Sequence, residues 1–327
     1  MYLNCKLTVT IDGVLLKTVS AVSINNDSKD IGSDCDIVVP INCRLEYADG
    51  THDFLNQIAN NPFNTGDEVV IQAQYDGYPL LTVFHGYVVD FIEGMPIKIK
   101  CQDNIFLLDQ TSISVAYQSV TLQQLIANVI QGTGIRLIQP ILQLNLVNIS
   151  FKDMSPAAIL EWLKRELGLV ITLSGTDLYV NIASNTLNVV KFSTDINVLR
   201  SDLQKPNAVF LKLKLKAWFI RENGTKDSLE VGDPNGQLRE VYFYKVPYNL
   251  SLYTQMANDA LAKYKQFRYQ GSIDALLYPD VNLYDKVNYN DVRYPDKNGN
   301  YVCVGIHTEL GAEGFHRKLR LSYLSDN

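Results

Sequence analysis

The sequence has few residues of the kinds that usually bind metals or cross-link a chain. Its four histidines are His52, His85, His307 and His316. Its five cysteines are Cys5, Cys35, Cys43, Cys101 and Cys303. No two histidines stand at a zinc-binding spacing, and the cysteines form no C-x-x-C pair. We therefore expect no metal site, and the odd number of cysteines indicates reduced thiols in a protein that folds in the cytosol.

Catalytic and cofactor motifs are also lacking. The chain has no P-loop and no G-x-S-x-G elbow. Gly132-Thr-Gly134 lacks the third glycine of a dinucleotide fingerprint and follows a predicted helix, so we interpret it as a helix end. One group of aspartates lacks the spacing of a calcium loop, so a solvated loop is favoured: Asp27, Asp30, Asp34 and Asp36. The sequence predicts no catalytic residue and no cofactor.

Positive charge and long apolar runs are scarce as well. Lys and Arg number 29 against 35 Asp and Glu, which gives a net charge of -6. That balance argues against a general nucleic-acid binder, because phosphate neutralisation needs a basic surface. No apolar run approaches the ~20 residues of a membrane-spanning helix. The start of the chain alternates like a strand and has no secretory pattern, so we expect no membrane insertion.

The sequence does contain one pattern of strands and turns that occurs twice. Each copy has a Pro-led turn, an Asp-x-Val strand entry, a strand with a glycine in its middle, a Glu-Gly turn and a return strand. The first copy includes Asp67, Val69, Gly86 and Glu93-Gly94, and the second includes Asp285, Val287, Gly305 and Glu313-Gly314. The duplication predicts two similar β domains in which Val69 and Val287 occupy equivalent strands.

The segments around these copies complete the predicted fold. Residues 1–104 alternate in short strands with turn signals such as Asp12-Gly13, which favours a small antiparallel barrel. Residues 105–205 contain helical periodicity and read as a small α+β domain. Residues 206–327 return to strands, with one helix. We expect a mainly β protein, with two related β-barrel domains flanking an α+β insertion.

The clearest element of the insertion is a helix that begins after Ser155. Ser155 is a good N-cap, Pro156 suits the first helical position and Gly168 suits the C-terminus. We expect this helix to pack through an apolar stripe, with Trp162 at its margin. The stripe consists of Ile159, Leu160, Leu163 and Leu167.

The one local basic feature is Lys212, Lys214 and Lys216, which alternate along a predicted strand and so share one face. An exposed face or a charge-protected edge is one interpretation. The other is a basic stripe that faces an acidic partner or a lumen through which DNA passes. The 19 tyrosines suit both strands and protein interfaces.

Three stretches resemble the baseplate hub proteins of contractile-tailed phages, the Mu-like tail hub and late control protein D group. They also resemble the hub part of type VI secretion spike proteins. The first is Gly86–Gly94 with Ile97–Asp103, and the second is Ser119–Ile126 with Phe151–Leu163. The third includes Gly271-Ser272, Pro279, Asp285, Val287, Gly299, Tyr301 and Cys303-Val304.

The resemblance implies a structural protein rather than an enzyme. It implies a homotrimer whose six β domains form a ring between the tail tube protein and the spike protein, with DNA able to pass through the lumen. It places the protein in the virion tail, at the baseplate, after assembly in the bacterial cytoplasm. Two alternatives stay open: a carbohydrate-binding module or enzyme that uses the α+β insertion, with Trp218, Tyr242 and Tyr244 as stacking aromatics, and the hub of a host-encoded contractile injection system.

Overall fold

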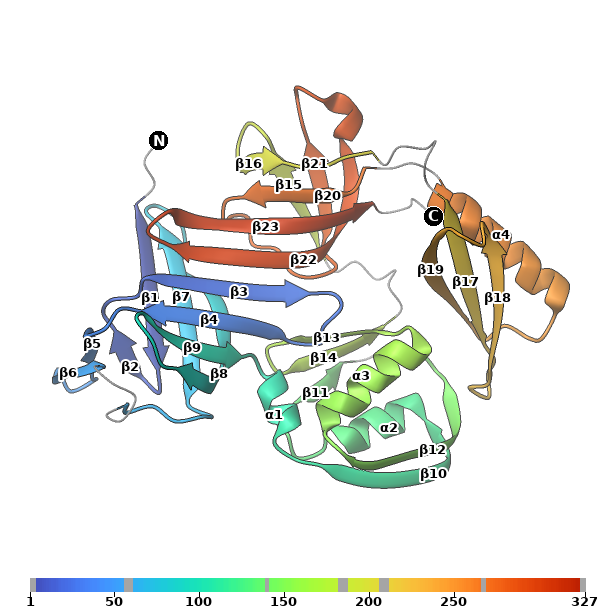
Figure 1. Ribbon diagram of the computed structural model, residues 1–327, viewed down its shortest axis with the longest axis horizontal. Coiled ribbons are helices and arrows are strands. Elements are labelled where there is room, and N and C mark those ends of the chain that lie inside the picture. The colour runs from blue at the N-terminus through green and yellow to red at the C-terminus, as the bar shows by residue number, and fades with distance from the viewer. Residues whose placement is uncertain are drawn as a thin grey trace.

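The chain folds around one large sheet that takes strands from both of its ends. Figure 1 shows the computed structural model, which describes residues 4–55, 61–138, 141–181, 188–205, 212–265 and 269–323. The sheet is 15-stranded and largely antiparallel, and its strand order is β16-β20-β23-β22-β3-β4-β9-β8-β7-β1-β2-β5-β6, with β21 pairing β22 and β15 pairing β21. This architecture confirms the predicted β-rich fold with an α+β insertion.

The N-terminal strands follow the predicted alternation. They are β1 (Cys5–Ile11), β2 (Val14–Leu16), β3 (Ala21–Asp27), β4 (Ser33–Val39), β5 (Cys43–Glu46), β6 (His52–Leu55), β7 (Glu68–Tyr75), β8 (Leu81–Ile92) and β9 (Ile97–Gln102). Asp12 and Gly13 both have positive φ, 47° and 75°, between the paired residues Ile11 and Val14. This is the geometry of the two-residue hairpin turn that the Asp-Gly pair predicted.

The C-terminal strands belong to the same sheet. They are β15 (Val189–Ser193), β16 (Val198–Ser201), β20 (Gly271–Ala275), β21 (Lys286–Asn290), β22 (Gly299–Gly311) and β23 (Gly314–Tyr323). A 3-10 turn, Pro295–Lys297, precedes β22. Figure 1 shows the red pair β22 and β23 lying beside the blue pair β3 and β4.

The two ends of the chain share one arrangement of paired strands. β7, β8 and β9 form an antiparallel meander, and so do β21, β22 and β23. β9 then pairs with β4, and β23 pairs with β20. Val69 and Val287 therefore hold equivalent places in the first strand of each meander. One difference is that β1 runs antiparallel to β7, whereas β15 runs parallel to β21.

The Asp-x-Val entry has the same hydrogen bonds in both copies. Asp67 Oδ2 accepts from Asn64 N, and Asp285 Oδ2 accepts from Asn282 N, each at 2.8 Å. The backbone N–H of Val88 donates to Asp67 O at 2.9 Å, and that of Cys303 donates to Asp285 O at 3.0 Å. In each copy the aspartate caps the turn that leads into the strand, which explains why the motif recurs.

The mid-strand glycines, however, are not equivalent. Gly86 is opposite Val69, whereas Tyr301, not Gly305, is opposite Val287. Gly305 follows a bulge after Cys303 in the second copy. The corresponding bulge in the first copy follows Val88, so the residue equivalent to Gly305 is Asp90. Gly86 is required by contact, because a Cβ at this position would lie 2.1 Å from Gln102 O.

The insertion is a compact α+β unit. Its elements are α1 (Ile105–Asp109), β10 (Ile113–Thr121), α2 (Leu122–Val129), β11 (Arg136–Ile138), β12 (Asn145–Met154), α3 (Pro156–Leu167), β13 (Val170–Ser174) and β14 (Asp177–Asn181). Thr121 and Gln124 form a capping box that starts α2. β10 pairs with β12, and β11, β14 and β13 form a second small sheet.

Helix α3 has the ends and the buried face that were predicted. Ser155 Oγ accepts from Ala158 N at 3.2 Å, and Gly168 ends the helix with a φ of 63°. Ile159, Leu160 and Leu163 are fully buried, and Leu167 nearly so. Trp162 lies at the margin, where its ring meets Phe151 edge-on at 5.2 Å.

A further three-stranded unit lies apart from the large sheet, on the right of Figure 1. It contains β17 (Leu213–Ile220), β18 (Lys226–Gly232), β19 (Gln237–Tyr244) and α4 (Leu250–Lys265). α4 covers one face of these strands through Tyr253, Ala257 and Leu261. No helix in the described ranges is long and apolar enough to cross a membrane.

The predicted ranges 1–104, 105–205 and 206–327 stay predictions, but strand pairing adds two observations. β15 and β16, which fall within 105–205, pair with strands of the C-terminal sheet. β17, β18 and β19, which fall within 206–327, pair only with one another among the described strands. The chain thus leaves the C-terminal sheet after β16 and returns to it at β20.

We predict that Leu163→Ala lowers the free energy of unfolding by about 2–5 kcal/mol, because the leucine is fully buried and its loss leaves a cavity. The exposed Glu161 on the same helix supplies the control, and Glu161→Ala should change stability by less than about 0.5 kcal/mol. Chemical denaturation measures both variants. Equal losses would show that the buried face of α3 is wrongly assigned.

Candidate functional site

The ionisable side chains do not gather into a reaction centre in the described part of the chain. No group of three or more His, Cys, Asp or Glu there could hold a metal ion. The histidines instead lie beside single carboxylates: His85 is 2.6 Å from Glu68, and His307 and His316 are 3.2 Å and 2.9 Å from Glu309. These contacts lie on strand surfaces.

Two buried carboxylates have raised pKa values, a property common at active sites. Burial raises the pKa of both Asp103 and Asp285. Asp103 accepts from the backbone and the hydroxyl of Ser33 at 2.7 and 2.8 Å, and Asp285 accepts from backbone N–H groups of Asn188 and Asn282 at 3.1 and 2.8 Å. Both carboxylates hold turns in place, so their environment has a structural explanation.

The most extensive polar contact between distant segments is the pairing of β3 with β22. It runs from Gly305 opposite Asp27 to Gly311 opposite Ala21 and joins β22 of the C-terminal meander to β3, which reaches the N-terminal meander through β4 and β9. Tyr284 Oη also donates to Ser28 O at 3.4 Å next to this junction. Because backbone pairing fixes register and direction, the two ends of the chain have a defined relative placement.

An ion pair closes one end of this junction. Arg320 donates to Asp27 Oδ1 at 2.6 Å and to Val304 O at 2.9 Å. Burial alone would raise the pKa of Asp27, but the hydrogen bonds and charges of Arg320 and Lys29 together outweigh it and hold that pKa below its usual value. The sequence offered Asp27 only as part of an acidic loop, and nothing local pointed to an arginine so far along the chain.

A cluster of aromatic rings closes the other end. The buried Tyr75 Oη donates to Phe315 O and accepts from Leu277 N. The Tyr278 ring lies 5.9 Å from that of Tyr75 and 4.8 Å from that of Tyr78, measured between centroids, and its hydroxyl donates to Pro79 O. Leu277 and Phe315 thereby join the core of the N-terminal strands. The abundance of tyrosine was the only sequence signal for this cluster.

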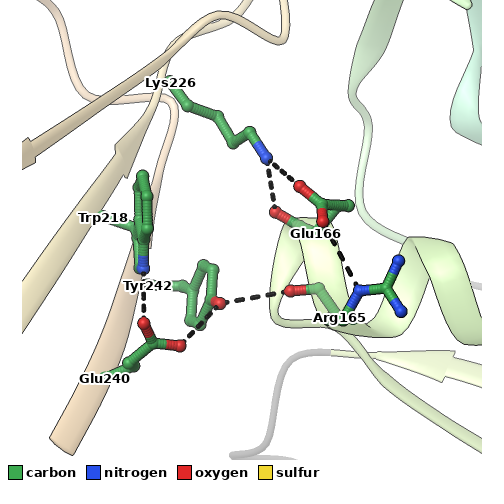
Figure 2. A network of polar contacts seen from close by, with 6 residues as sticks. All are labelled: Arg165, Glu166, Trp218, Lys226, Glu240 and Tyr242. Carbon is green, nitrogen blue, oxygen red and sulfur yellow. Dashed lines mark hydrogen bonds and ion pairs between the residues drawn. The ribbon is translucent and has the colours of Figure 1, made fainter. Parts of the chain in front are cut away.

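The three-stranded unit is attached to the end of α3 by the contacts drawn in Figure 2. Lys226 Nζ donates to Glu166 Oε2 at 2.6 Å and to Glu166 O at 3.1 Å. Tyr242 Oη donates to Arg165 O at 3.2 Å, and Tyr244 Oη donates to Leu167 O. These bonds satisfy carbonyls that the last turn of any helix leaves free.

Close approach at this attachment depends on Gly168. A Cβ added there would lie 2.2 Å from Cδ2 of the Tyr242 ring. Glycine is therefore required at position 168 for two reasons: the backbone has a positive φ, and the Tyr242 ring leaves no room for a side chain. Burial, with the neighbouring Glu240, raises the pKa of Tyr242 to about 12, so its hydroxyl remains a donor.

The three lysines of the predicted stripe lie at or in β17, on the face away from α4. Lys214 forms an ion pair with Glu230 at 2.7 Å, and Lys216 Nζ lies 4.2 Å from the centroid of the Trp218 ring. Lys212 precedes the strand and is exposed. The face is therefore mixed in charge.

The aromatics weighed as sugar platforms are engaged within the chain. Lys216 Nζ lies over the Trp218 ring, that ring also stacks with Tyr242, and Trp218 Nε1 donates to Glu240 at 3.3 Å. Tyr242 and Tyr244 donate to α3 as described.

The fold is similar to those of solved phage-tail and secretion structures. The chain is 15% identical to the 43 kDa tail protein of prophage MuSo2 from Shewanella oneidensis, with a TM-score of 0.62 over 96% of this chain and 97% of that one. It is 15% identical to the tail protein of Neisseria meningitidis MC58, with a TM-score of 0.62 over 98% and 97%. It is 9% identical to the Escherichia coli c3393 protein, a component of the type VI secretion system, with a TM-score of 0.58 over 97% and 77%.

These likenesses confirm the resemblance at the level of fold. No protein-family model and no curated protein sequence matches the chain. The similarity is thus one of architecture, retained at low sequence identity.

We predict that the Asp27–Arg320 pair makes stability depend on pH in the acid range. Because the folded pKa of Asp27 is lowered, its stabilisation is complete above the ordinary carboxyl pKa of about 3.9 and disappears as pH falls through the folded value. The loss caused by Asp27→Asn in urea denaturation should be larger at pH 7 than at pH 3. Arg320→Met should show the same trend, and a loss independent of pH would contradict the assignment.

We predict that Gly168→Ala destabilises the protein more than Gly175→Ala does. Both glycines have φ near 60°, but nothing lies within 4 Å of a Cβ at Gly175. Each substitution should lower the free energy of unfolding by about 1 kcal/mol, because alanine is strained at positive φ. Gly168→Ala should lower it by about 1–3 kcal/mol more, because the new methyl group clashes with Tyr242. Chemical denaturation gives the difference, and limited proteolysis should show the three-stranded unit released only in Gly168→Ala. Equal losses would mean that the ring does not press on this turn.

Proposed function

We propose that the protein is a structural hub of a contractile tail, in which three copies form a ring that joins the tail tube to the central spike. The observation that carries the proposal is the match between the two ends of the chain. Their meanders agree in strand order and register, down to the Asp67 and Asp285 caps. Three chains with two such units each supply six similar positions around one axis.

The mechanical properties of the fold support this role. The two units share one sheet across β3 and β22, so their relative placement does not depend on a flexible linker. A joint that carries load during contraction needs such continuity. In the proposed ring the six similar units contact the tube on one side and the spike binds on the other.

The remaining parts of the proposal follow the resemblance. The protein acts without catalysis, in the virion tail at the baseplate, after assembly in the bacterial cytoplasm. DNA passes through the lumen, which Lys212, Lys214 and Lys216 face. A structure of the assembled ring with these lysines on its outer wall would remove the lumen part alone.

A host-encoded contractile injection system is the second candidate. The likeness to the type VI secretion component from Escherichia coli favours it to a similar degree as the tail proteins favour a phage. Both candidates use the same ring. The proteins encoded next to this chain, tube, sheath and spike with or without capsid, distinguish them.

We predict that the chain, co-expressed with the tube and spike proteins of its own gene neighbourhood, enters a complex that contains three copies. Native mass spectrometry should show a component of three times the 36.8 kDa chain, and contacts between copies should each bury more than ~1,000 Å². The chain expressed alone is the control for partner dependence. A complex with another copy number, or no complex with either partner, would refute the hub.

A further inference from the structure

Among the strand edges that lack a partner in the described residues, two lie in the repeated parts of the large sheet. The first, the β8 edge, is Asp90–Ile92, which pairs with β9 on one side and extends past the end of β7. The second, the β16 edge, is Arg200–Lys205, which includes the end of β16 and bonds β20 and Gln270 on one side only. Exposed edges invite pairing with another chain, so their partner needs to be identified.

The internal repeat shows what each edge corresponds to. Val88 and Cys303 are equivalent through their bonds to Asp67 and Asp285. Counting on from them through matching bulges makes Ile92 the counterpart of His307. The β8 edge therefore corresponds to Gly305–His307, the first part of the β22 segment that pairs with β3.

The β16 edge corresponds to β3 itself. Cys35 pairs with the same residue of β9 that pairs with Val88, and Gly271 pairs with the same residue of β23 that pairs with Cys303. Cys35 and Gly271 are therefore equivalent. Gln204, opposite Gln270, is then the counterpart of Asn25, opposite Asp34. Within the chain His307 pairs with Asn25, so the repeat maps this pair onto Ile92 and Gln204.

The side-chain faces agree with this register. Leu203 is buried like its counterpart Ile24, and Phe91 packs on the core of its own unit as Ile306 packs on the other. Ile92 and Gln204 are exposed, and so is Asn25. A slip of one residue would turn each buried side chain to the wrong face, so the faces exclude that slip, and the internal repeat selects this register.

We propose that the β16 edge of one copy pairs antiparallel with the β8 edge of the next copy, with Gln204 opposite Ile92, and so repeats between chains the β3–β22 junction found within each chain. The partner is a second copy of this chain, and the inference rests on the proposed ring. The contact is heterologous, so it closes at three copies when the rotation within the chain equals the rotation between chains. Ile92, 38% exposed, is covered by this contact.

Cross-linking tests the register. Ile92→Cys and Gln204→Cys are combined in one chain, with the exposed Cys5 replaced by Ser; the other cysteines, Cys35, Cys43, Cys101 and Cys303, are buried. The chain is co-expressed with its tube and spike proteins and treated with a short bismaleimide. We expect the band on a denaturing gel to shift from one chain to two and three chains.

Matched variants make the result specific. Ile92→Cys alone, Gln204→Cys alone, and Ile92→Cys with Leu199→Cys should remain at one chain. Asn25→Cys with His307→Cys reproduces the junction inside the chain, so it should cross-link without a change in mass, and its cross-linked fraction is the reference.

The outcomes separate the two proposals. The inference is supported if bands of three cross-linked chains appear with Ile92→Cys plus Gln204→Cys and with none of the control variants. A three-copy complex by native mass spectrometry with the 92–204 pair still at one chain overturns the edge pairing and leaves the hub intact. Cross-linking as strong from the 92–199 pair overturns the register. A chain that never forms a three-copy complex refutes both the hub and the pairing.

Discussion

The structure depends on the backbone pairing between β3 and β22. This ladder brings the first strands of the chain against its last strands and converts two meanders into one sheet. The Asp27–Arg320 pair and the rings around Tyr75 close its two ends. Without this ladder the N-terminal core would lose Leu277, Leu310 and Phe315, which come from the other end of the chain.

Helix α3 transmits this placement to the rest of the molecule. On one side Lys164 Nζ donates to Asp30 O at 2.7 Å, in the turn between β3 and β4, and Leu173 N donates to Ile31 O at 3.1 Å. On the other side its last turn receives Lys226 and Tyr242 from the three-stranded unit. The same short helix therefore holds the large sheet and the outlying unit, and Ile31 enters the core of the insertion.

Local features of the structure could be predicted from the sequence. The Asp12-Gly13 hairpin, the ends of α3 and its buried leucine stripe each depend on residues a few positions apart, where turn and capping chemistry act. The duplication could be recognised in the sequence because Asp67 and Asp285 cap the same turn in the two copies. The resemblance to tail hubs rested on the order of such features, and the fold confirmed it.

Features that depend on distant partners could not be predicted. Nothing near Asp27 indicates Arg320, and nothing in the alternation of β15 or β16 shows that they pair with β21 and β20. The mid-strand glycines were equated by position, whereas a bulge shifts the register and gives them different roles. Likewise the lysines of β17 predicted a basic stripe, because the sequence does not show that the neighbouring strand places Glu230 beside Lys214.

The β3–β22 pairing also constrains how the protein is made. A ribosome releases β3 long before β22, so the nascent chain holds an open strand edge and an apolar core that still lacks Leu310 and Phe315. Ladders between such distant segments form slowly, and exposed edges and apolar surface promote aggregation meanwhile. Completion of the first unit therefore waits until β22 and β23 have been synthesised, and these distant strands complete the burial of the first ones.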